Sequence, residues 1–234
     1  MTQPSYRQFC PTAMAAEILC TRWTILLLRE LLDGTSRFND LRRGVPRMSP
    51  ALLSRRLKEL EEAGVVVRRR AQGSSDIFEY CLTEAGRELE PIVTAMGQWG
   101  QRWIETEVSL QHLDAQLLMW SMRRNLNTDA LPPERRCVIQ FQYPEQPVPA
   151  DRHWWFIAEA DGSVDLCGID PGFDVDLYVS SDLRTMTAVW MGYESLTTAL
   201  ADEKVHLIGD RAIASSIRTW IGSSGLAVVE RKVC

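Results

Sequence analysis

The chain has 234 residues, a formal net charge of −5 and a hydrophobic fraction of 45%. This length leaves room for two modest domains, each with a core of its own. No apolar run approaches the roughly 20 residues of a membrane span, and the N-terminal residues do not have the form of a signal peptide. The six cysteines and three histidines are scattered, without a CxxC pair or the spacing of metal ligands. We therefore expect a cytoplasmic protein that has reduced cysteines and no membrane segment, metal or cofactor.

The first predicted element is a helix that begins at Pro11. Cys10 directly precedes it, so the positive end of the helix dipole would stabilise the Cys10 thiolate, lower its pKa and raise its reactivity. A redox-sensitive cysteine is therefore one interpretation. The alternative is a cysteine buried as a small hydrophobic side chain.

A leucine-rich helix is predicted next, from Trp23 to Leu32, and Gly34 after it is a residue that commonly ends helices. Ser36 and Ser49 are good N-caps for two helices that follow. Pro50 occupies the first helical position, where proline is tolerated. This order of helices is the layout of a helix-turn-helix.

The helix that begins after Ser49 has an apolar face and a polar face. At 100° per residue, Leu53, Leu57 and Leu60 share one narrow face. Short polar or cationic side chains lie on the opposite face: Ala51, Ser54, Arg55 and Lys58. A helix in the major groove of DNA needs this arrangement, because the leucines hold it down while the other face meets the bases. The alternative is that the cationic side chains only form a solvated helix face.

Two strand-like segments, 65–70 and 77–82, follow this helix and form a wing with a turn that contains Gly73. The root of the wing carries Arg68, Arg69 and Arg70. From there, arginine side chains can reach phosphates or a minor groove.

The charge of the chain is unevenly distributed. Residues 37–70 contain ten Lys and Arg against four Asp and Glu, a local charge of +6, whereas residues 109–234 have a net charge of −6. This asymmetry indicates that one half of the chain meets phosphate and the other does not. We expect the following residues to contact DNA: Arg37, Ser49, Pro50, Ser54, Arg55, Lys58, Arg68, Arg69 and Arg70.

Several motifs between residues 10 and 105 together resemble the HxlR-type winged-helix regulators. They are Cys10-Pro11, Arg22-Trp23-Thr24, Arg37-Phe38-Asn39-Asp40-Leu41, the helix from Ser49 to Leu60, Ala63-Gly64, and Tyr80-Cys81-Leu82-Thr83-Glu84-Ala85-Gly86. The resemblance implies a homodimeric bacterial transcription factor that binds an inverted-repeat operator in double-stranded DNA. It also implies that Cys10 stands where some members sense electrophiles or oxidants. The wing tip, residues 71–77, departs from the family because it lacks the proline that is often found there.

A longer helix is predicted from Glu84 to about Glu107. Its apolar side chains recur at intervals of three and four residues: Leu89, Ile92, Met96, Trp99 and Trp103. Gly97 and Gly100 would permit the close approach of another helix, so we expect this helix to form a dimer contact. The alternative is that the stripe packs inside its own chain.

Residues 109–234 are predicted to form an α+β domain, with one sheet face covered by helices. Asp161-Gly162 is a strong hairpin signal. The stretch from Asp176 to Trp220 resembles the sterol carrier protein-like fold through DLYVSSD, the helix that ends in Trp190-Met191-Gly192, SLTTALAD and KVHLIGD. The resemblance implies an apolar tunnel for fatty-acyl or sterol-like molecules, lined by Trp154, Phe156, Leu177, Met186, Trp190 and Trp220. These side chains could instead be plain core, or line a tunnel that has filled in.

The sequence thus predicts an α+β protein with a winged helix-turn-helix domain (residues 1–108) and a sterol carrier protein-like domain (residues 109–234). We expect a DNA-binding regulator and not an enzyme, since the chain has no Gly-x-Ser-x-Gly, P-loop or dinucleotide fingerprint. An apolar ligand in the second domain would control it. One alternative is a redox-sensing regulator that acts through Cys10 and has a purely structural second domain. Another is a lipid-carrier or scaffold protein whose winged helix makes protein contacts.

Overall fold

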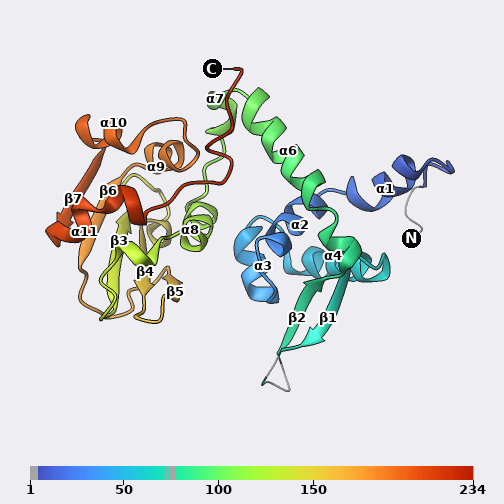
Figure 1. Ribbon diagram of the computed structural model, residues 1–234, viewed down its shortest axis with the longest axis horizontal. Coiled ribbons are helices and arrows are strands. Elements are labelled where there is room, and N and C mark those ends of the chain that lie inside the picture. Colours follow the sequence, from blue (N-terminus) through green and yellow to red (C-terminus); the bar gives the residue numbers. More distant parts are fainter. Residues whose placement is uncertain (1–4, 72, 74–76, 234) are drawn as a thin grey trace. The chain divides into compact units, whose positions relative to one another are not determined.

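The computed structural model describes residues 5–71, 73 and 77–233. The chain divides into two compact units, an N-terminal unit (Met1–Gly97) and a C-terminal unit (Gln98–Cys234). Helices and strands are mixed, as the sequence predicts, and the elements are labelled in Figure 1. None of the described helices combines the length and the apolar character that crossing a bilayer would need. The predicted domain boundary after residue 108 stays a prediction.

The N-terminal unit is a helical domain with a two-stranded wing. Its elements are α1 (Pro11–Leu19), α2 (Thr24–Leu32), α3 (Phe38–Gly44), α4 (Pro50–Glu62), β1 (Val66–Arg70), β2 (Phe78–Leu82), α5 (Glu84–Arg87) and the first part of α6 (Glu90–Trp103). The predicted leucine stripe of α4, Leu53, Leu57 and Leu60, is buried in one apolar cluster with leucines of α2 and α3. This burial holds α4 on the unit by one face and leaves its other face in solvent.

The two predicted serine caps have different outcomes. Ser49 caps α4, because its Oγ accepts a hydrogen bond from the backbone N–H of Leu52 at 3.3 Å. The prediction for Ser36 is wrong: Arg37 is the N-cap residue of α3, and no side chain caps this helix. The carbonyl of Ser36 instead accepts a hydrogen bond from the N–H of Tyr80 at 2.8 Å. Pairing with β2 therefore keeps the chain extended past Ser36 and delays the helix.

The single helix predicted from Glu84 to Glu107 is also wrong, because the chain forms α5, α6 and α7 (Thr106–Ser109) there. Pro91 explains the first break. It has no N–H to donate to the carbonyl of Arg87, and its ring would clash with that carbonyl in a continuous helix. At the second break, the carbonyl of Gln101 accepts a hydrogen bond from the Arg231 side chain, 2.9 Å away. A continuous helix would have used this carbonyl for the N–H of residue 105.

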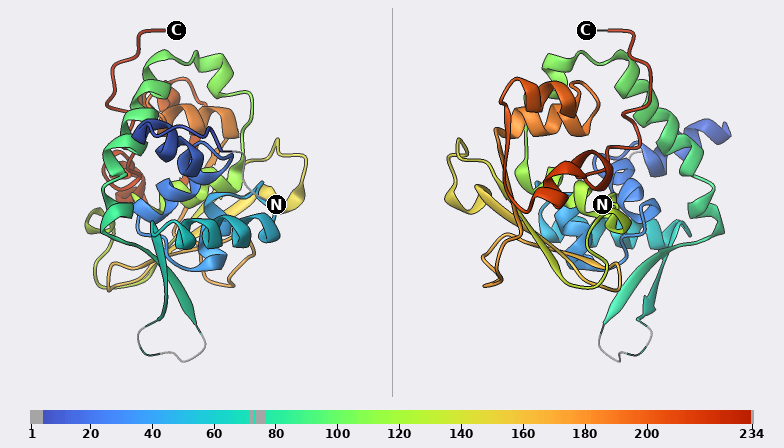
Figure 2. Two further views of the ribbon diagram at one scale, coloured as in Figure 1. Left: turned by 90° about the vertical axis from the view of Figure 1, so that its right-hand side faces the viewer. Right: turned by 60° about the vertical axis from the view of Figure 1, so that its left-hand side comes forward.

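The C-terminal unit contains a five-stranded sheet in the order β5-β4-β3-β6-β7. Its elements after α7 are α8 (Ala115–Arg124), two short 3-10 turns (Thr128–Ala130 and Pro149–Asp151), β3 (Cys137–Gln142), β4 (His153–Ala158), β5 (Val164–Cys167), β6 (Leu177–Ser181), α9 (Leu183–Trp190), α10 (Leu196–Ala201), β7 (Val205–Gly209), α11 (Arg211–Ser215) and α12 (Ile217–Trp220). Only β3 and β6 pair in parallel; the other pairs are antiparallel. Figure 2 gives two further views of this sheet and its helices.

The main apolar cluster of this unit lies on one face of the sheet. Side chains from that face, among them Ile139 and Phe141, pack with side chains of α8, α9, α11 and α12. Residues of the other face of β3 and β4, among them Val138 and Ile157, are buried as well, so the prediction of a single covered face is wrong for these strands.

The sequence after Gly209-Asp210 predicts one helix as far as Trp220, and this prediction is wrong, because α11 and α12 form there instead. The indole N–H of Trp220 donates to the carbonyl of Ile213 at 2.8 Å. This carbonyl is the one that the N–H of Ile217 would need if the helix continued.

Candidate DNA-binding surface

The solvent-facing side of α4 presents the residues that were predicted to meet DNA. Ser49, Pro50, Ser54, Arg55 and Lys58 are all exposed. A hydroxyl-capped N-terminus with exposed polar side chains is suited to phosphate and base contacts, because the first backbone N–H groups and the helix dipole favour an anion.

The two cations on α4 are paired with glutamates one turn further along the helix. Arg55 Nε lies 2.9 Å from Glu59 Oε1, and Lys58 Nζ lies 3.6 Å from Glu62 Oε1. Arg56, which was not among the predicted contacts, also pairs with Glu59 and donates to the carbonyl of Arg22 at 3.3 Å. Partial burial raises the pKa of Glu59, but hydrogen bonds and charge from Arg55 and Arg56 outweigh it, so the pKa is lowered. Glu59 is therefore an ionised carboxylate that holds the Arg55 guanidinium.

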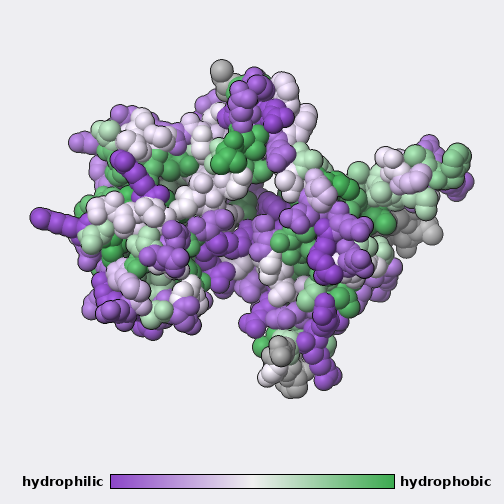
Figure 3. All heavy atoms as spheres, in the orientation of Figure 1, coloured by the Kyte–Doolittle hydropathy of each residue, from purple (hydrophilic) through white to green (hydrophobic). Residues whose placement is uncertain are grey.

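The arginines at the wing root occupy both faces of the hairpin. Arg68 and Arg70 lie over the ring of Phe78, with guanidinium carbons 3.9 and 6.0 Å from its centroid. Arg69 is opposite Glu79, with which Arg37 forms an ion pair of 3.5 Å (Nε to Oε1). Figure 3 shows hydrophilic residues, in purple, along this part of the molecule. Arg37, Arg68, Arg69 and Arg70 are all exposed.

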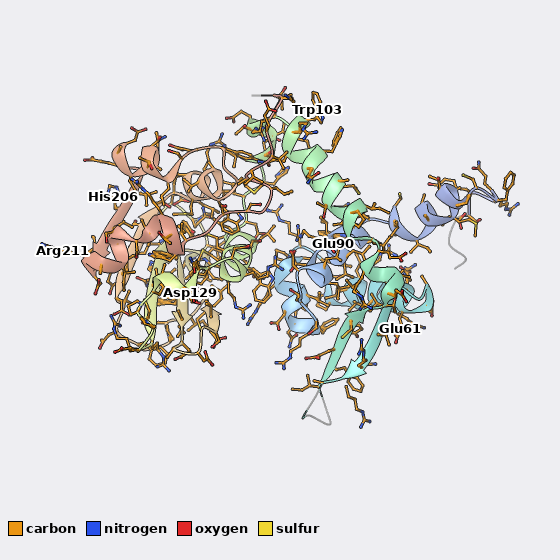
Figure 4. The ribbon with its side chains drawn as sticks, viewed as in Figure 1. Glu61, Glu90, Trp103, Asp129, His206 and Arg211 are labelled. Carbon is orange, nitrogen blue, oxygen red and sulfur yellow. The ribbon has the colours of Figure 1, made fainter. Side chains whose placement is uncertain are left out.

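The wing tip lies mostly outside the described residues. Of residues 71–77, the structure describes Ala71, Gly73 and Ile77, and the N–H of Ala71 donates to the carbonyl of Ile77 at 2.8 Å. In the middle of β1, the N–H of Arg68 donates to Oε1 of Glu61 at 3.4 Å. Glu61 is labelled on α4 in Figure 4. This contact joins the wing root to the last turn of α4.

Three more exposed cations lie near this surface, although they were not predicted as contacts. They are Arg42 and Arg43 at the end of α3 and Arg47 in the turn before α4. The local charge of +6 between residues 37 and 70 includes them. This charge excess is the signal in the sequence that could have identified them.

The comparisons with known proteins agree with this geometry. The profile of the HxlR-like helix-turn-helix family matches residues 18–108. Over 99 residues, the chain is 38% identical to YvaP, an uncharacterized HTH-type transcriptional regulator of Bacillus subtilis (strain 168), covering 42% of this chain and 92% of YvaP. The chain belongs to the HxlR-like helix-turn-helix family. Its predicted N-terminal resemblance is thereby confirmed, for about the first 110 residues.

Two further matches lie within the same range of identity. YdeP, another uncharacterized HTH-type transcriptional regulator of Bacillus subtilis (strain 168), is 37% identical over 94 residues, which are 40% of this chain and 73% of YdeP. A solved structure of the redox regulator HypR in its reduced form is 37% identical, covers 39% of this chain and 91% of that chain, and has a TM-score of 0.37.

In this HxlR-like protein, α6 carries an apolar stripe that is largely exposed. Glu90 and Trp103, labelled in Figure 4, mark the two ends of the helix. Exposed fractions are 47% for Ile92, 52% for Met96, 60% for Trp99 and 49% for Trp103, whereas Leu89 packs against the core of the N-terminal unit. Large apolar side chains at this spacing are costly to leave in water, so the stripe fits a contact surface.

Cys10 is the N-cap residue of α1 and is exposed. The nearby backbone N–H groups of Ala13 and Thr12 and the Thr12 side chain lower the pKa of the Cys10 thiol, although no side-chain hydrogen bond caps α1. The alternative of a cysteine buried as a small hydrophobic side chain is therefore wrong for the single chain. The position of Cys10 at the start of α1 and its lowered pKa agree with the predicted stabilisation of its thiolate.

The side chains proposed to line a tunnel in the C-terminal unit are all buried in one cluster: Trp154, Phe156, Leu177, Met186, Trp190 and Trp220. The indole N–H of Trp154 donates to the carbonyl of Asp151 at 3.0 Å, and that of Trp220 is bonded within its own helices. The indole N–H groups of Trp154 and Trp220 are thus satisfied. Among the residues that the structure describes, no three metal-ligating side chains come together.

Proposed function

We propose that this HxlR-like protein is a homodimeric transcriptional regulator that binds an inverted-repeat operator and responds to an apolar ligand in its C-terminal unit. The observation that carries the DNA-binding part is the division of α4 into two faces. Its leucines are buried, while its polar and cationic residues and the arginines of the wing root are exposed on the unit that belongs to the family. Ser54, Arg55 and Lys58 would face the major groove, and the wing root would contact the backbone.

Binding requires a change of partners at Arg55. The guanidinium is held by Glu59 in the free protein and would exchange this carboxylate for a guanine edge or a phosphate. A guanine at the correct DNA position offers two acceptors and so compensates for the lost ion pair between Arg55 and Glu59. Another base at that position does not. Glu59 would therefore favour specific over random DNA.

The proposed dimer uses the exposed stripe of α6. Trp99 and Trp103 are large, half-exposed aromatic side chains, and residues of this kind are enriched in protein interfaces. A twofold dimer would present two copies of α4 to the two halves of an inverted repeat.

The proposed ligand site uses the core of the C-terminal unit, for which we keep the sterol carrier protein-like fold as a hypothesis. Support comes from the strands and helices found near the predicted segments, β6 followed by α9, and β7 followed by α11. The candidate side chains converge in one apolar cluster between sheet and helices. A fatty-acyl or sterol-like molecule would enter by displacing core contacts, and would regulate binding only if it favoured one conformation.

Operator binding tests the central claim. Fluorescence anisotropy with DNA from upstream of the protein's own gene would compare wild type with Arg55→Ala and a matched control, Arg211→Ala. Arg211 is an exposed residue of α11, labelled in Figure 4. If Arg55 reads a guanine, its removal costs about 1–3 kcal/mol on the operator and less on random DNA. Equal losses on both would make it a phosphate contact.

The same titration distinguishes the regulator from a lipid-carrier or scaffold protein whose winged helix makes protein contacts. A regulator loses affinity steeply as salt rises, because phosphate contacts release counterions. Absence of binding to the upstream DNA at low salt would favour the carrier or scaffold. Native mass spectrometry followed by solvent extraction would then identify any apolar molecule that the purified protein carries.

A second candidate function is redox sensing through Cys10, with a purely structural C-terminal unit. The exposed position and lowered pKa of this thiol favour it. Diamide should then weaken operator binding by the wild type and by Cys20→Ser, which removes another exposed cysteine. Cys10→Ser should abolish the response, and a response that persists would contradict this function.

A further inference from the structure

Arg231, close to the C-terminus, binds the end of α6. Its Nη1 donates to the carbonyl of Gln101 at 2.9 Å, and its Nη2 donates to the carbonyl of Ile104 at 2.8 Å and to Thr106 Oγ1 at 3.0 Å. Carbonyls in the last turn of a helix lack partners within the helix, and a cation there also interacts favourably with the helix dipole. The forked guanidinium thus satisfies two carbonyls and a hydroxyl at once.

The same arginine is tied to the segment that follows α9. Its guanidinium carbon lies 4.4 Å from the centroid of the Tyr193 ring. The Tyr193 hydroxyl donates to Gln101 Oε1 at 3.1 Å, and Gln101 Nε2 donates to the carbonyl of Met191 at 2.9 Å. Gln101 is only 4% exposed, so its two side-chain hydrogen bonds lie at the buried end of this network.

The backbone on either side of Arg231 also forms hydrogen bonds with α9 and α6. The N–H of Ser224 donates to the carbonyl of Trp190, and that of Lys232 donates to the carbonyl of Arg102, both at 2.9 Å. Gly192 has a φ of +74°, and a Cβ there would stand 2.9 Å from the Cβ of Ala227. The C-terminal segment is therefore packed closely against the end of α9.

The beginning of α9 holds the chain just after α6 as well. Arg184 Nη2 lies 2.6 Å from Glu107 Oε1, in α7. The opposite side of α9 carries Met186 and Trp190, which are buried in the apolar cluster. α9 thus contacts the proposed ligand site on one side, and α7, directly after α6, on the other.

We propose that Arg231 is a positioning residue that fastens the last turn of α6 to α9, so that a displacement of α9 is transmitted to α6. The regulatory meaning rests on the proposed function, since α6 is the proposed dimer helix and α9 the proposed ligand wall. The fastening itself needs neither DNA nor ligand.

Hydrogen exchange measured by mass spectrometry on the full chain tests the fastening. Arg231→Ala should raise exchange in residues 98–109 about tenfold, because charged hydrogen bonds to the helix end are lost. Arg231→Lys, which keeps the charge without the fork, should lie between wild type and Arg231→Ala. Lys232→Ala is the matched control, because this side chain pairs only with the exposed Glu230 among the described contacts. Unchanged exchange in Arg231→Ala, or an equal rise in Lys232→Ala, would overturn the proposal.

A second variant tests the transmission. Met186→Leu changes the buried side of α9 at nearly constant volume, and it should raise exchange in residues 98–109 in the wild-type background but add little to Arg231→Ala. Additive effects would overturn transmission through Arg231 and leave the fastening intact. The exchange is measured at two protein concentrations, because protection by self-association depends on concentration and the contact within one chain does not. Because no measurement uses operator DNA, a failure of the proposed function appears separately, as absence of DNA binding by the wild type.

Discussion

The carboxylate of Glu30 occupies the space where a side chain on Gly44 would stand. A Cβ at Gly44 would lie 2.0 Å from both Cδ and Oε2 of Glu30, which is fully buried. Arg29 Nη2 pairs with Glu30 Oε1 at 2.8 Å and also donates to the carbonyl of Gly44 at 3.1 Å. The end of α3 is therefore locked against α2 by a buried charge that cannot move aside cheaply.

Gly44→Ala should destabilise the N-terminal unit. The added methyl must displace a buried, paired carboxylate, and we expect a loss of about 2 kcal/mol in the free energy of unfolding. Urea unfolding followed by circular dichroism measures this loss. Gly225→Ala is the control, because nothing lies within 4 Å of a Cβ there. Equal stabilities of the two variants would contradict the close packing of Glu30 on Gly44.

Glu59→Gln should strengthen binding to random DNA more than binding to the operator. The substitution removes a negative charge from α4 and weakens the hold on Arg55 and Arg56, with an expected gain of about threefold to tenfold on random DNA. Because the pKa of Glu59 is lowered below its ordinary value, the carboxylate stays ionised at neutral pH and at mildly acidic pH. Operator affinity between pH 5 and about pH 8 should therefore show no titration of this group. A gain that is equal on both DNAs would refute its role in specificity.

Trp99→Ser should weaken the dimer without unfolding the chain. Trp99 is 60% exposed in the single chain, so its loss costs little within one protomer, whereas an aromatic anchor in an interface is commonly worth about 2 kcal/mol or more. Sedimentation velocity over a dilution series should show that the variant dimer dissociates at a higher protein concentration than the wild-type dimer. Ile208→Ser, at a residue of β7 that is 70% exposed, is the control. If both variants dissociate alike, α6 is not the contact.

Cys10 should remain reactive at a lower pH than an ordinary thiol. Its lowered pKa means that the thiolate, the reactive form, persists as the pH falls toward the lowered value and is lost only below it. Alkylation by iodoacetamide, followed peptide by peptide, should give a midpoint for Cys10 below the roughly 8.5 of a free cysteine. Thr12→Val removes the hydroxyl that helps to lower this pKa and should move the midpoint upward. A midpoint at or above the ordinary value would contradict the lowered pKa of Cys10.

Local patterns in the sequence predict much of the N-terminal unit. The leucine stripe of α4, the Ser49 cap and both strands of the wing follow from spacing and from residue types. The break before α6 was equally readable, since Pro91 stands in the sequence, but the apolar periodicity across it suggested one helix. The pairing of Arg55 with Glu59 also follows from their spacing on a helix.

Long-range contacts could not be predicted in this way. Ser36 is a good cap by type, and it loses that role only because Tyr80 pairs with its carbonyl. The contact between Arg231 and Gln101 joins residues 130 positions apart, and nothing in the local sequence of either one indicates the other. The position of β6 beside β3 is likewise a property of the folded sheet.

This parallel pair has a consequence for the order in which the chain folds. β3 can pair with β6 only after the intervening β4 and β5 have been synthesised. Ile139, for example, pairs with Leu177. The α-helices and the wing of the N-terminal unit need mainly contacts between near neighbours in sequence, which form fast, whereas the sheet needs distant ones, which form slowly. During synthesis, the N-terminal unit leaves the ribosome first and can fold while the sheet is still incomplete. A nascent chain would thus carry a finished α4 before it carries α9 and the rest of the proposed ligand site.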